Sequence, residues 1–353
     1  MAPKSYKAAV GVRGDCLYCP LSLSIDSYWN CLADCHHCYF RRLNRTWGQD
    51  LRPADPVAVR KQLQNGLKNP NPRSTLAWAL HHKKTLRLGN HSDPYQDAEK
   101  EHRVTRGILK ALIELGWTFV IQSRFLSNIL LDRDLLEESH QRGLLHILPV
   151  ISPGAEEDQE VLERGRTTPI PRRLRIIKRW IQKGYKVGVN GEPFIPGYHT
   201  PEQFRDILRR LREVGVRSYN TYNLHANDLV FKRFHSLGLD IEKIWRHNQD
   251  DKWRSLLQQL LAIAEEEGMV LGCPDFVNSG WDWEEKANTC CGIDVPNPSR
   301  FNTHIWKRIL QDLDRPSKAS ILKDTWEGIG DLEEGRLVLR GGSQDFYTMK
   351  DVK

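Results

Sequence analysis

The sequence predicts an α/β protein built as a partial (β/α)6 TIM-like barrel. The chain has 353 residues, which is enough to bury one large core. Between about residues 80 and 275, short β-type runs alternate with helical ones. This alternation is typical of a parallel sheet whose strands are joined by helices. Neither an internal repeat nor a low-complexity tract interrupts it.

The expected elements follow one another as strand and helix. The first strand is expected near residues 8–12, ahead of a cysteine-rich loop. The later strands are expected at 85–88, 117–122, 145–151, 185–190, 218–224 and 269–272. The helices between them are expected at 99–115, 133–142, 171–183, 201–214 and 252–267, with Gly215 as a stop signal.

The C-terminal part differs from the rest of the chain. It contains Trp281, Trp283, paired cysteines, turn residues and one expected helix near residues 301–313. We therefore expect residues 1–275 to form the barrel with its N-terminal cysteine loop. Residues 276–353 are expected to form a Cys-containing C-terminal extension that caps the barrel mouth.

Composition and charge narrow the class of protein. Hydrophobic content of 39% and charged content of 27% are typical of a globular chain. The net charge of +7 is compatible with a polyanionic partner without requiring one. No apolar run has the length of a membrane span, and the N-terminus lacks the apolar core of a signal peptide. We expect a cytoplasmic protein with no membrane partner, whose clustered cysteines bind metal instead of forming disulfides.

The most specific motif is the segment that holds Cys31, Cys35 and Cys38. Three thiolates suit an iron–sulfur cubane that leaves one iron open for chemistry. In an α/β barrel, loops at the carboxyl ends of strands carry the reactive groups. The alternative is a structural zinc knuckle with His36 or His37 as the fourth ligand, although zinc sites more often use paired CxxC units.

The x3–x2 spacing of this triad resembles the signature of radical S-adenosylmethionine (SAM) enzymes. Later segments resemble the spore photoproduct lyase-like branch of that superfamily, namely residues 89–96, 121–124 before Arg133-Asp134, Arg172, and 193–197. The chain departs from that branch at Gln122, where a lysine is usual. The resemblance implies a [4Fe–4S] cluster whose open iron binds SAM, and reductive cleavage of SAM to a 5′-deoxyadenosyl radical.

The same resemblance implies a set of cofactor-contacting residues at the ends of the strands. His37 occupies the position before the third cysteine, which lies near the adenine in that family. Glu192, after the expected strand 185–190, could accept a hydrogen bond from a ribose hydroxyl or the methionine amine. The full set is His37, Tyr39, Gly89, Asn90, Ser92, Asp93, Ser123, Arg124, Asn190 and Glu192. Each also has a plainer interpretation as a turn, strand-end or loop residue.

Five further cysteines lie outside the triad, at positions 16, 19, 273, 290 and 291. Cys273 follows an expected strand, so it belongs at the same end of the barrel as the triad. Four or more thiols there could hold a second, auxiliary iron–sulfur cluster. Zinc binding and unligated thiols are the alternatives, and Cys290 or Cys291 could return a hydrogen atom to a product radical. The candidate auxiliary ligands are Cys16, Cys19, Cys273, Cys290 and Cys291.

The predicted function is that of a radical SAM enzyme, of isomerase or lyase type. It would abstract hydrogen from a nucleic-acid base, namely thymine or a modified thymine in DNA, for modification or repair. The expected partners are DNA and an external electron donor such as flavodoxin or ferredoxin. Basic segments at 172–180 and 205–212 could track phosphates, and Trp281, Trp283 or Tyr95 could stack on an unpaired base. Exposed helix faces are the plainer interpretation of these charges. The rival functions are a radical SAM enzyme for a peptide or small molecule, and a zinc protein that binds nucleic acid.

Overall fold

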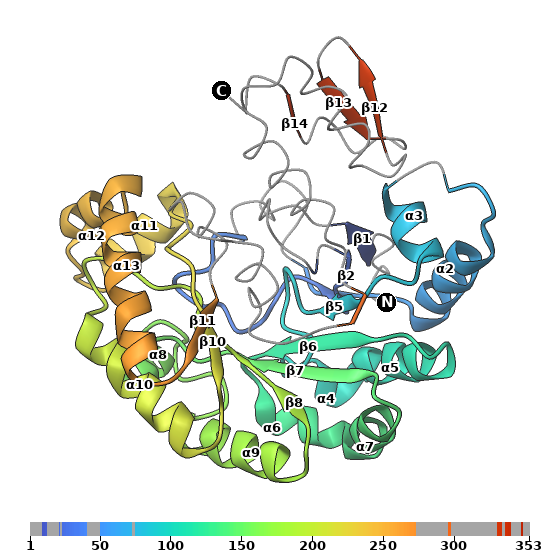
Figure 1. The fold of residues 1–353 in the computed structure, drawn as a ribbon, viewed down its shortest axis with the longest axis horizontal. Coiled ribbons are helices and arrows are strands. Elements are labelled where there is room, and N and C mark those ends of the chain that lie inside the picture. The colour runs from blue at the N-terminus through green and yellow to red at the C-terminus, as the bar shows by residue number, and fades with distance from the viewer. Residues whose placement is uncertain are drawn as a thin grey trace.

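The structure is a computed structural model. The structure describes residues 9–12, 21, 23–40, 50–72, 75–272 and 296–297, and the backbone of residues 330–333, 336–339 and 347–348. Figure 1 shows the arrangement of the described elements.

A curved sheet of mostly parallel strands forms the centre of the molecule (Figure 1). Its larger part has the order β1-β2-β5-β6-β7-β8 and its smaller part the order β9-β10-β11. A parallel bridge between Val150 and Asn190 links the two parts. The strands are β1 (Val10–Val12), β2 (Leu23–Ile25), β5 (Leu86–Leu88), β6 (Phe119–Ser123), β7 (Leu145–Pro149), β8 (Lys186–Val187), β9 (Val189–Asn190), β10 (Ser218–Asn220) and β11 (Val270–Gly272).

Helices connect the parallel strands and lie along one side of the sheet (Figure 1). Their starts follow local capping rules: Asp55 caps the helix at Pro56, and Thr200 forms a capping box with Gln203 ahead of Pro201. The helices are α2 (Pro56–Lys68), α3 (Thr75–His81), α4 (Glu99–His102), α5 (Val104–Glu114), α6 (Leu126–Ile129), α7 (Arg133–Gln141), α8 (Ala155–Val161), α9 (Ile170–Gln182), α10 (Pro201–Glu213), α11 (Asp228–Ser236), α12 (Ile241–His247) and α13 (Asp250–Glu266).

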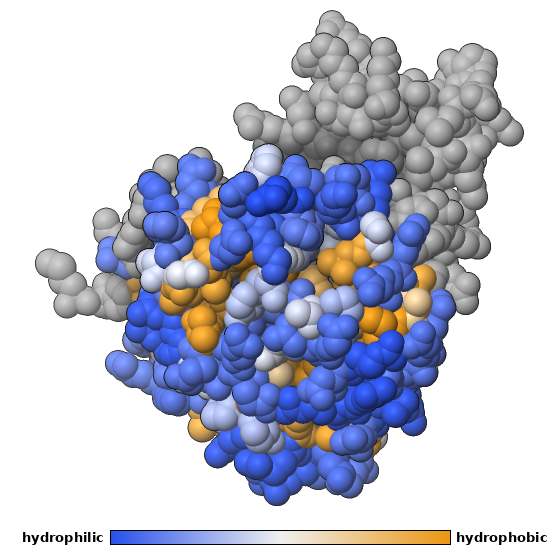
Figure 2. Space-filling model, turned by 90° about the vertical axis from the view of Figure 1, so that its left-hand side faces the viewer, coloured by the Kyte–Doolittle hydropathy of each residue, from blue (hydrophilic) through white to orange (hydrophobic). Residues whose placement is uncertain are grey.

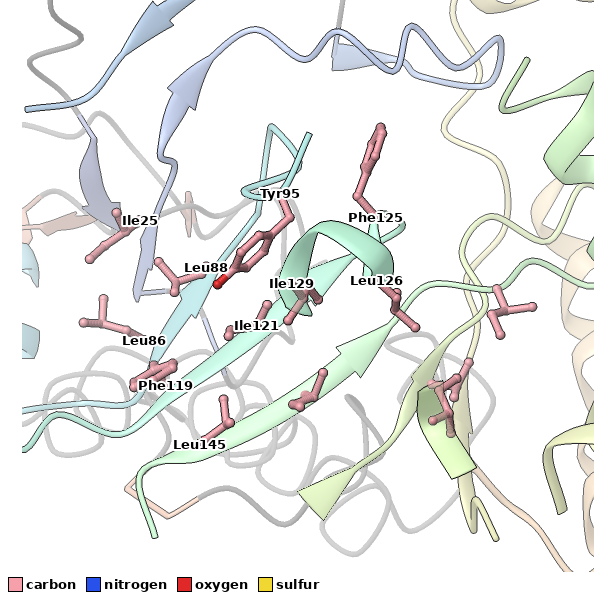
Figure 3. Close-up of a cluster of buried hydrophobic side chains, with 14 of the residues drawn as sticks. Ile25, Leu86, Leu88, Tyr95, Phe119, Ile121, Phe125, Leu126, Ile129 and Leu145 are labelled. Carbon is pink, nitrogen blue, oxygen red and sulfur yellow. The ribbon is translucent and has the colours of Figure 1, made fainter. Parts of the chain in front are cut away.

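The two faces of the sheet differ in chemistry. Ile25, Leu88 and Ile121 stand beside one another in register and belong to the large buried apolar cluster (Figure 3). Successive side chains of a strand point to opposite faces, so their neighbours in sequence face the other way. On that other face, Ser24 pairs with Arg87, and His146 lies in register two strands further along. One face therefore packs against helices, and the face turned away from them mixes polar groups with buried apolar residues such as Val120 and Leu148.

The alternation predicted from residue 85 onward is confirmed, with some changes at the boundaries. The expected helix 99–115 is two helices, because Arg103 adopts a left-handed conformation with φ of 52°. The expected strand 185–190 is divided at Gly188 into β8 and β9, which belong to different parts of the sheet. The parallel α/β sheet is thus established.

The start of the sheet was predicted wrongly. The strand near residues 8–12 exists as β1, but it runs antiparallel to β2. The strand that begins the parallel series is β2, which pairs with β5. The cysteine segment therefore follows β2 and the short β3 (Tyr28–Trp29), which pairs with β4 (Arg52–Pro53).

Closure of the sheet and the C-terminal extension stay predictions. No pairing among the described strands joins β11 to β1, so the described sheet is open. The expected helix at 301–313 lies outside the described residues. Asn297, which belongs to the extension, hydrogen-bonds to the segment just before β5. Its carbonyl accepts from Thr85 N, and its side-chain amide donates to the carbonyls of His82 and Lys83. The strands β12 (Gly330–Glu333), β13 (Arg336–Leu339) and β14 (Tyr347–Thr348) form a separate antiparallel sheet. Among the described helices, none is long and apolar enough to cross a membrane.

Candidate active site at the carboxyl ends of the strands

The cysteine loop follows β3 at the carboxyl end of β2, the first strand of the parallel series, and turns tightly. The N–H of Cys38 donates to the carbonyl of Cys35 at 3.1 Å, which closes the turn. The amide of Gln96 holds the entry to the loop, accepting from Leu32 N at 2.7 Å and donating to Asn30 O at 3.0 Å. No disulfide joins the three thiols, and Cys35 is only 7% exposed. The loop presents three thiols from eight consecutive residues.

The thiols of this loop are close enough to influence one another's ionisation. Burial raises the pKa of Cys31 to about 12, and the charges of Asp93 and the Cys38 thiolate act in the same direction. Burial also raises the pKa of Cys35, with Glu163 and the other two thiolates adding to it and the Arg124 cation opposing it. Without a bound cation, Cys31 and Cys35 would stay protonated at neutral pH. A positively charged metal cluster would reverse this preference.

The donor set suits a cubane cluster. Within the described residues, no three His, Cys, Asp or Glu side chains converge closely enough for a single metal ion. A cubane does not require such convergence, because each thiolate binds a different iron atom. The three soft thiols and the half-buried Arg124 cation beside Cys35 therefore fit an iron–sulfur cluster.

A buried charge network lies behind the cysteine loop. Arg124, at the end of β6, donates from Nε to Glu163 Oε1 at 2.9 Å and from Nη2 to Glu192 O at 2.9 Å. Arg173 of α9 is fully buried and binds the same Glu163 carboxylate through both terminal nitrogens. Although burial raises the pKa of Glu163, the charges of Arg173 and Arg124 outweigh it and lower that pKa to about 2. Glu163 is therefore a carboxylate at all physiological pH values.

His37 connects this network to the cysteine loop. Its Nε2 lies 3.3 Å from Arg124 Nη2, and its Nδ1 is buried without a hydrogen-bond partner among the described residues. Burial, followed by the Arg124 charge, lowers the pKa of His37 to about 3. The ring is neutral above that pH, so it offers a polar, uncharged edge beside the triad.

The loop after β5 and the end of β6 are joined through Asp93. Its carboxylate accepts from Ser123 Oγ at 2.7 Å and from the backbone N–H of Arg124 at 2.7 Å. Asp26, which the sequence analysis did not identify, accepts from the backbone N–H of Asn90, His91 and Ser92 at 2.8 to 3.3 Å. Ser92 Oγ donates to Tyr28 O at 2.7 Å. The predicted residues of this loop are thus brought together, and several of their polar groups hold the loop itself.

Gly89 supports the same junction. It has a φ of 91°, and an added Cβ would lie 2.5 Å from Gln122 O and 2.6 Å from Pro94. Only glycine fits this backbone conformation in so small a space. Gly89 therefore shapes the loop and cannot be replaced by a residue with a side chain.

The ends of β9 and β10 place a carboxylate at the same edge of the sheet. Glu192 Oε1 accepts from Asn220 Nδ2 at 3.1 Å, and Asn190 Oδ1 accepts from Glu192 N at 2.7 Å. Asn220 Oδ1, Thr221 Oγ1 and Gln122 Oε1 are buried without a hydrogen-bond partner among the described residues. Since buried polar atoms are normally satisfied, such a group of atoms suggests a polar ligand at this edge.

Gly191 allows β9 and β10 to approach each other. A Cβ at position 191 would lie 2.0 Å from the hydroxyl of Tyr219, which is fully buried and donates to Ile151 O at 2.9 Å. We expect Gly191→Ala to reduce the free energy of unfolding by about 1–3 kcal/mol, the usual cost of overpacking. Urea denaturation measures this loss. In a Tyr219→Leu background most of the loss should disappear, and an equal loss in both backgrounds would exclude the steric explanation.

Aromatic side chains meet beside the cysteine loop. The ring of His225 lies 4.9 Å from Tyr39 and 4.7 Å from Tyr222, and all three are half-buried. Tyr95, predicted as a stacking residue, cannot take that role, because it is fully buried and donates to Asp132 Oδ2 at 3.1 Å (Figure 3). The other stacking candidates, Trp281 and Trp283, lie outside the described residues. So do the candidate auxiliary ligands Cys16, Cys19, Cys273, Cys290 and Cys291.

The two predicted basic segments differ in how far their positive charges are paired with carboxylates. In α9, Arg172, Arg175, Lys178 and Arg179 are exposed, whereas Arg173 is buried in the charge network. In α10, the arginines pair with carboxylates: Arg210 with Glu156, and Arg205 and Arg209 with Glu267. The face that carries α10 to α13 is mostly hydrophilic (Figure 2). The α10 segment is thus largely neutralised by its own neighbours.

Comparison with known proteins gives distant likenesses. No protein-family model matches the chain. It is 25% identical over 215 residues to the uncharacterized protein Rv2578c of Mycobacterium tuberculosis, over 58% of this chain and 59% of the relative. It is 24% identical over 232 residues to the uncharacterized protein ORF301 of Acidianus two-tailed virus, over 63% of this chain and 71% of that protein. The match thus spans less than two thirds of the mycobacterial relative. Among solved structures, Streptococcus suis SuiB bound to S-adenosylmethionine is similar with a TM-score of 0.46 and 10% identity, over 71% of this chain and 49% of SuiB.

Proposed function

We propose that this protein is a radical SAM enzyme whose Cys31, Cys35 and Cys38 hold a [4Fe–4S] cluster. The observation that carries the proposal is the position of the triad. Its three thiols lie at the carboxyl edge of a parallel sheet, next to the half-buried Arg124 and to several buried polar atoms that have no hydrogen-bond partner among the described residues. When bound, the cluster and SAM would supply a one-electron reductive cleavage that yields a 5′-deoxyadenosyl radical.

The residues around the triad have separate tasks in this proposal. Arg124 places a positive charge beside Cys35 and so stabilises a thiolate there. Glu192, Asn190 and Asn220 offer carboxylate and amide groups to the amine or ribose of SAM. Asp26, Gly89 and Asp93 hold the loops from which these groups are presented. The sheet and its loops exclude water and orient the reacting groups.

The proposed substrate is a thymine base, unmodified or modified, in DNA, with an isomerase or lyase outcome. The net charge of +7 and the exposed cations of α9 support a polyanionic partner. The Tyr39–His225–Tyr222 group supports stacking on an unpaired base at this edge. In a duplex, the base would have to leave the stack, at a cost of a few kcal/mol.

The test is anaerobic purification followed by iron and acid-labile sulfide analysis and by reduction in the presence of SAM. We expect iron and sulfide in the protein, and 5′-deoxyadenosine together with methionine after reduction. Zinc without sulfide, and no cleavage of SAM, would identify a structural zinc protein instead.

The substrate is tested separately, with thymine-containing oligonucleotides. We expect them to raise the rate of 5′-deoxyadenosine release and to yield a changed nucleoside in mass spectrometry. If DNA neither binds nor changes that rate, the substrate assignment fails, and a peptide or small molecule becomes the better candidate.

A further inference from the structure

Three arginines surround the outer side of the cysteine loop. Together with two loop residues they form a surface that we name the arginine patch. It consists of Leu32, Asp34, Arg164, Arg166 and Arg233. Arg164 and Arg166 come from the segment after α8, and Arg233 comes from α11. The patch therefore gathers around a loop residue that is next in sequence to Cys35.

Asp34 is the centre of the patch. Its carboxylate forms ion pairs with Arg164, with Arg233 at 3.0 Å and with Arg166 at 4.0 Å. The three guanidinium groups outnumber this carboxylate and that of Glu160, which lies beside Gly165 between Arg164 and Arg166, so a local excess of positive charge remains. The side chains of Arg164 and Arg166 are 37% and 47% exposed, so this excess is accessible to a partner.

The patch is attached directly to the triad. Arg233 Nη1 donates to the carbonyl of Cys35 at 2.9 Å, and Arg166 Nη1 donates to the carbonyl of Leu32 at 3.4 Å. Leu32 lies between Cys31 and Asp34 and is 46% exposed. An apolar side chain ringed by charges is a common composition for a small protein–protein contact.

Both residues of the Asp34–Arg164 ion pair have a strained backbone conformation. Asp34 has a φ of 54° and Arg164 has a φ of 60°, although neither is glycine. Such conformations cost on the order of 1 kcal/mol or more and concentrate at functional sites. The fold therefore holds Arg164 and Asp34 in place at this surface against a local preference.

We propose that the arginine patch is the docking surface for an acidic one-electron carrier protein that has a flavin or iron–sulfur centre. The inference rests on the proposed function, because a cluster that cleaves SAM reductively needs an electron from outside. The carrier is oxidised by one electron, and the [4Fe–4S]²⁺ state at the triad takes up that electron to become [4Fe–4S]⁺. No bond is made or broken in this step.

The position of the patch favours an electron carrier over nucleic acid. Electron transfer weakens steeply with distance. A carrier seated on Leu32 and Asp34 would contact the residues next in sequence to Cys31 and Cys35, two of the proposed cluster ligands. The acidic surface of such a carrier complements the excess of arginine, which would speed its association. Three arginines can neutralise only a few phosphates, so they would contribute little to binding a nucleic-acid backbone.

The experiment compares two charge-reversal variants, Arg166→Glu in the patch and Arg142→Glu as the control. Arg166 has the loosest contact with Asp34, so its replacement leaves the closer pairs of Asp34 with Arg164 and Arg233 in place. Arg142 has a similar exposure of 42%, but it follows α7 at the opposite, amino-terminal edge of the sheet. Circular dichroism and thermal melting verify that both variants fold.

Two readouts are measured with oxidised and reduced flavodoxin as the probe. The first is the dissociation constant of oxidised flavodoxin, from calorimetry at low and moderate salt. The second is the rate of cluster reduction by reduced flavodoxin, in stopped flow. We expect Arg166→Glu to weaken binding and slow reduction about tenfold or more at low salt, whereas Arg142→Glu leaves both as in the wild type. Dithionite, a small reductant that needs no docking, should reduce wild type and Arg166→Glu alike.

Three results would overturn the docking proposal. They are no binding of flavodoxin to the wild type, equal behaviour of the two variants, and a weaker affinity of Arg166→Glu for a DNA oligonucleotide with unchanged affinity for flavodoxin. A wild-type protein that dithionite reduces without any cleavage of SAM would instead refute the proposed function. The two failures are therefore distinguishable.

Discussion

A Cys35→Ala protein is expected to contain neither a stable cluster nor SAM-cleaving activity. Cys35 is the most buried thiol of the triad, and no other cysteine of the described residues lies on this loop beyond Cys31 and Cys38. Two thiolates would leave two irons of a cubane without protein ligands, and a cluster held in that way is lost. We expect iron and sulfide contents at background and 5′-deoxyadenosine below detection, measured after anaerobic reconstitution and reduction.

Ser139→Ala is the matched control for this variant. It also removes one heteroatom from a buried side chain, since Ser139 is fully buried in α7 and donates to Leu135 O at 2.6 Å. It should cost about 1 kcal/mol of stability and leave the cluster intact. A Cys35→Ala protein that keeps its iron and sulfide would show that the ligands lie elsewhere, and the proposed function would have to be abandoned.

The cysteine triad could be predicted from the sequence because its geometry is local. All three thiols come from eight consecutive residues, and the spacing alone brings them onto one turn. Similarly, Asp93, Arg124 and Glu192 follow strands that could be predicted individually, and the carboxyl ends of parallel strands meet at one edge. Local pattern and one topological rule were thus enough to predict most of the edge.

The residues that hold this edge together could not be predicted in the same way. Glu163 lies 39 residues from Arg124, and Asp26 lies 64 residues from Asn90. Nothing in a local window indicates such a pairing, because either residue alone looks like an ordinary surface charge. The exposed Arg172 and the buried Arg173 show the same difficulty, since only the helical phase relative to the sheet distinguishes them.

The strand β2 was missed for a different reason. The segment Leu21-Ser-Leu-Ser-Ile25 does alternate apolar and polar residues, which is a strand signal. The run is short, and the parallel sheet was expected to begin at residues 8–12. Ser24 lies on the face turned away from the helices, where it stands in register with Arg87. A polar residue at an alternating position of a strand can therefore face polar side chains as well as solvent. A short strand with apolar residues on one face and polar residues on the other is thus easily mistaken for a loop.

Removing the charge of Glu163, in the network behind the triad, is expected to reduce the free energy of unfolding more than removing an exposed charge. Glu163→Gln keeps the size of the side chain but leaves Arg173, which is fully buried, without a counter-ion. Breaking a buried pair by neutralising one partner typically costs about 3–5 kcal/mol of the free energy of unfolding. The exposed pair of Glu242 and Arg246 on α12 supplies the control, and Glu242→Gln should cost less than about 1 kcal/mol. Urea denaturation at neutral pH measures both.

The pH dependence of this cost distinguishes a charge effect from a packing effect. The folded protein lowers the pKa of Glu163 from 4.5 to about 2, since the charges of Arg173 and Arg124 outweigh the opposing effect of burial. A lowered pKa means that the carboxylate stabilises the fold fully above pH 4.5, and that this contribution declines as the pH falls toward 2. By linkage the contribution is about 3 kcal/mol. The stability difference between wild type and Glu163→Gln should therefore shrink over that acidic range, whereas the Glu242→Gln difference stays small throughout. A difference that remained constant down to the acid limit would mean that the amide disturbs packing, and that the two arginines do not depend on the Glu163 charge.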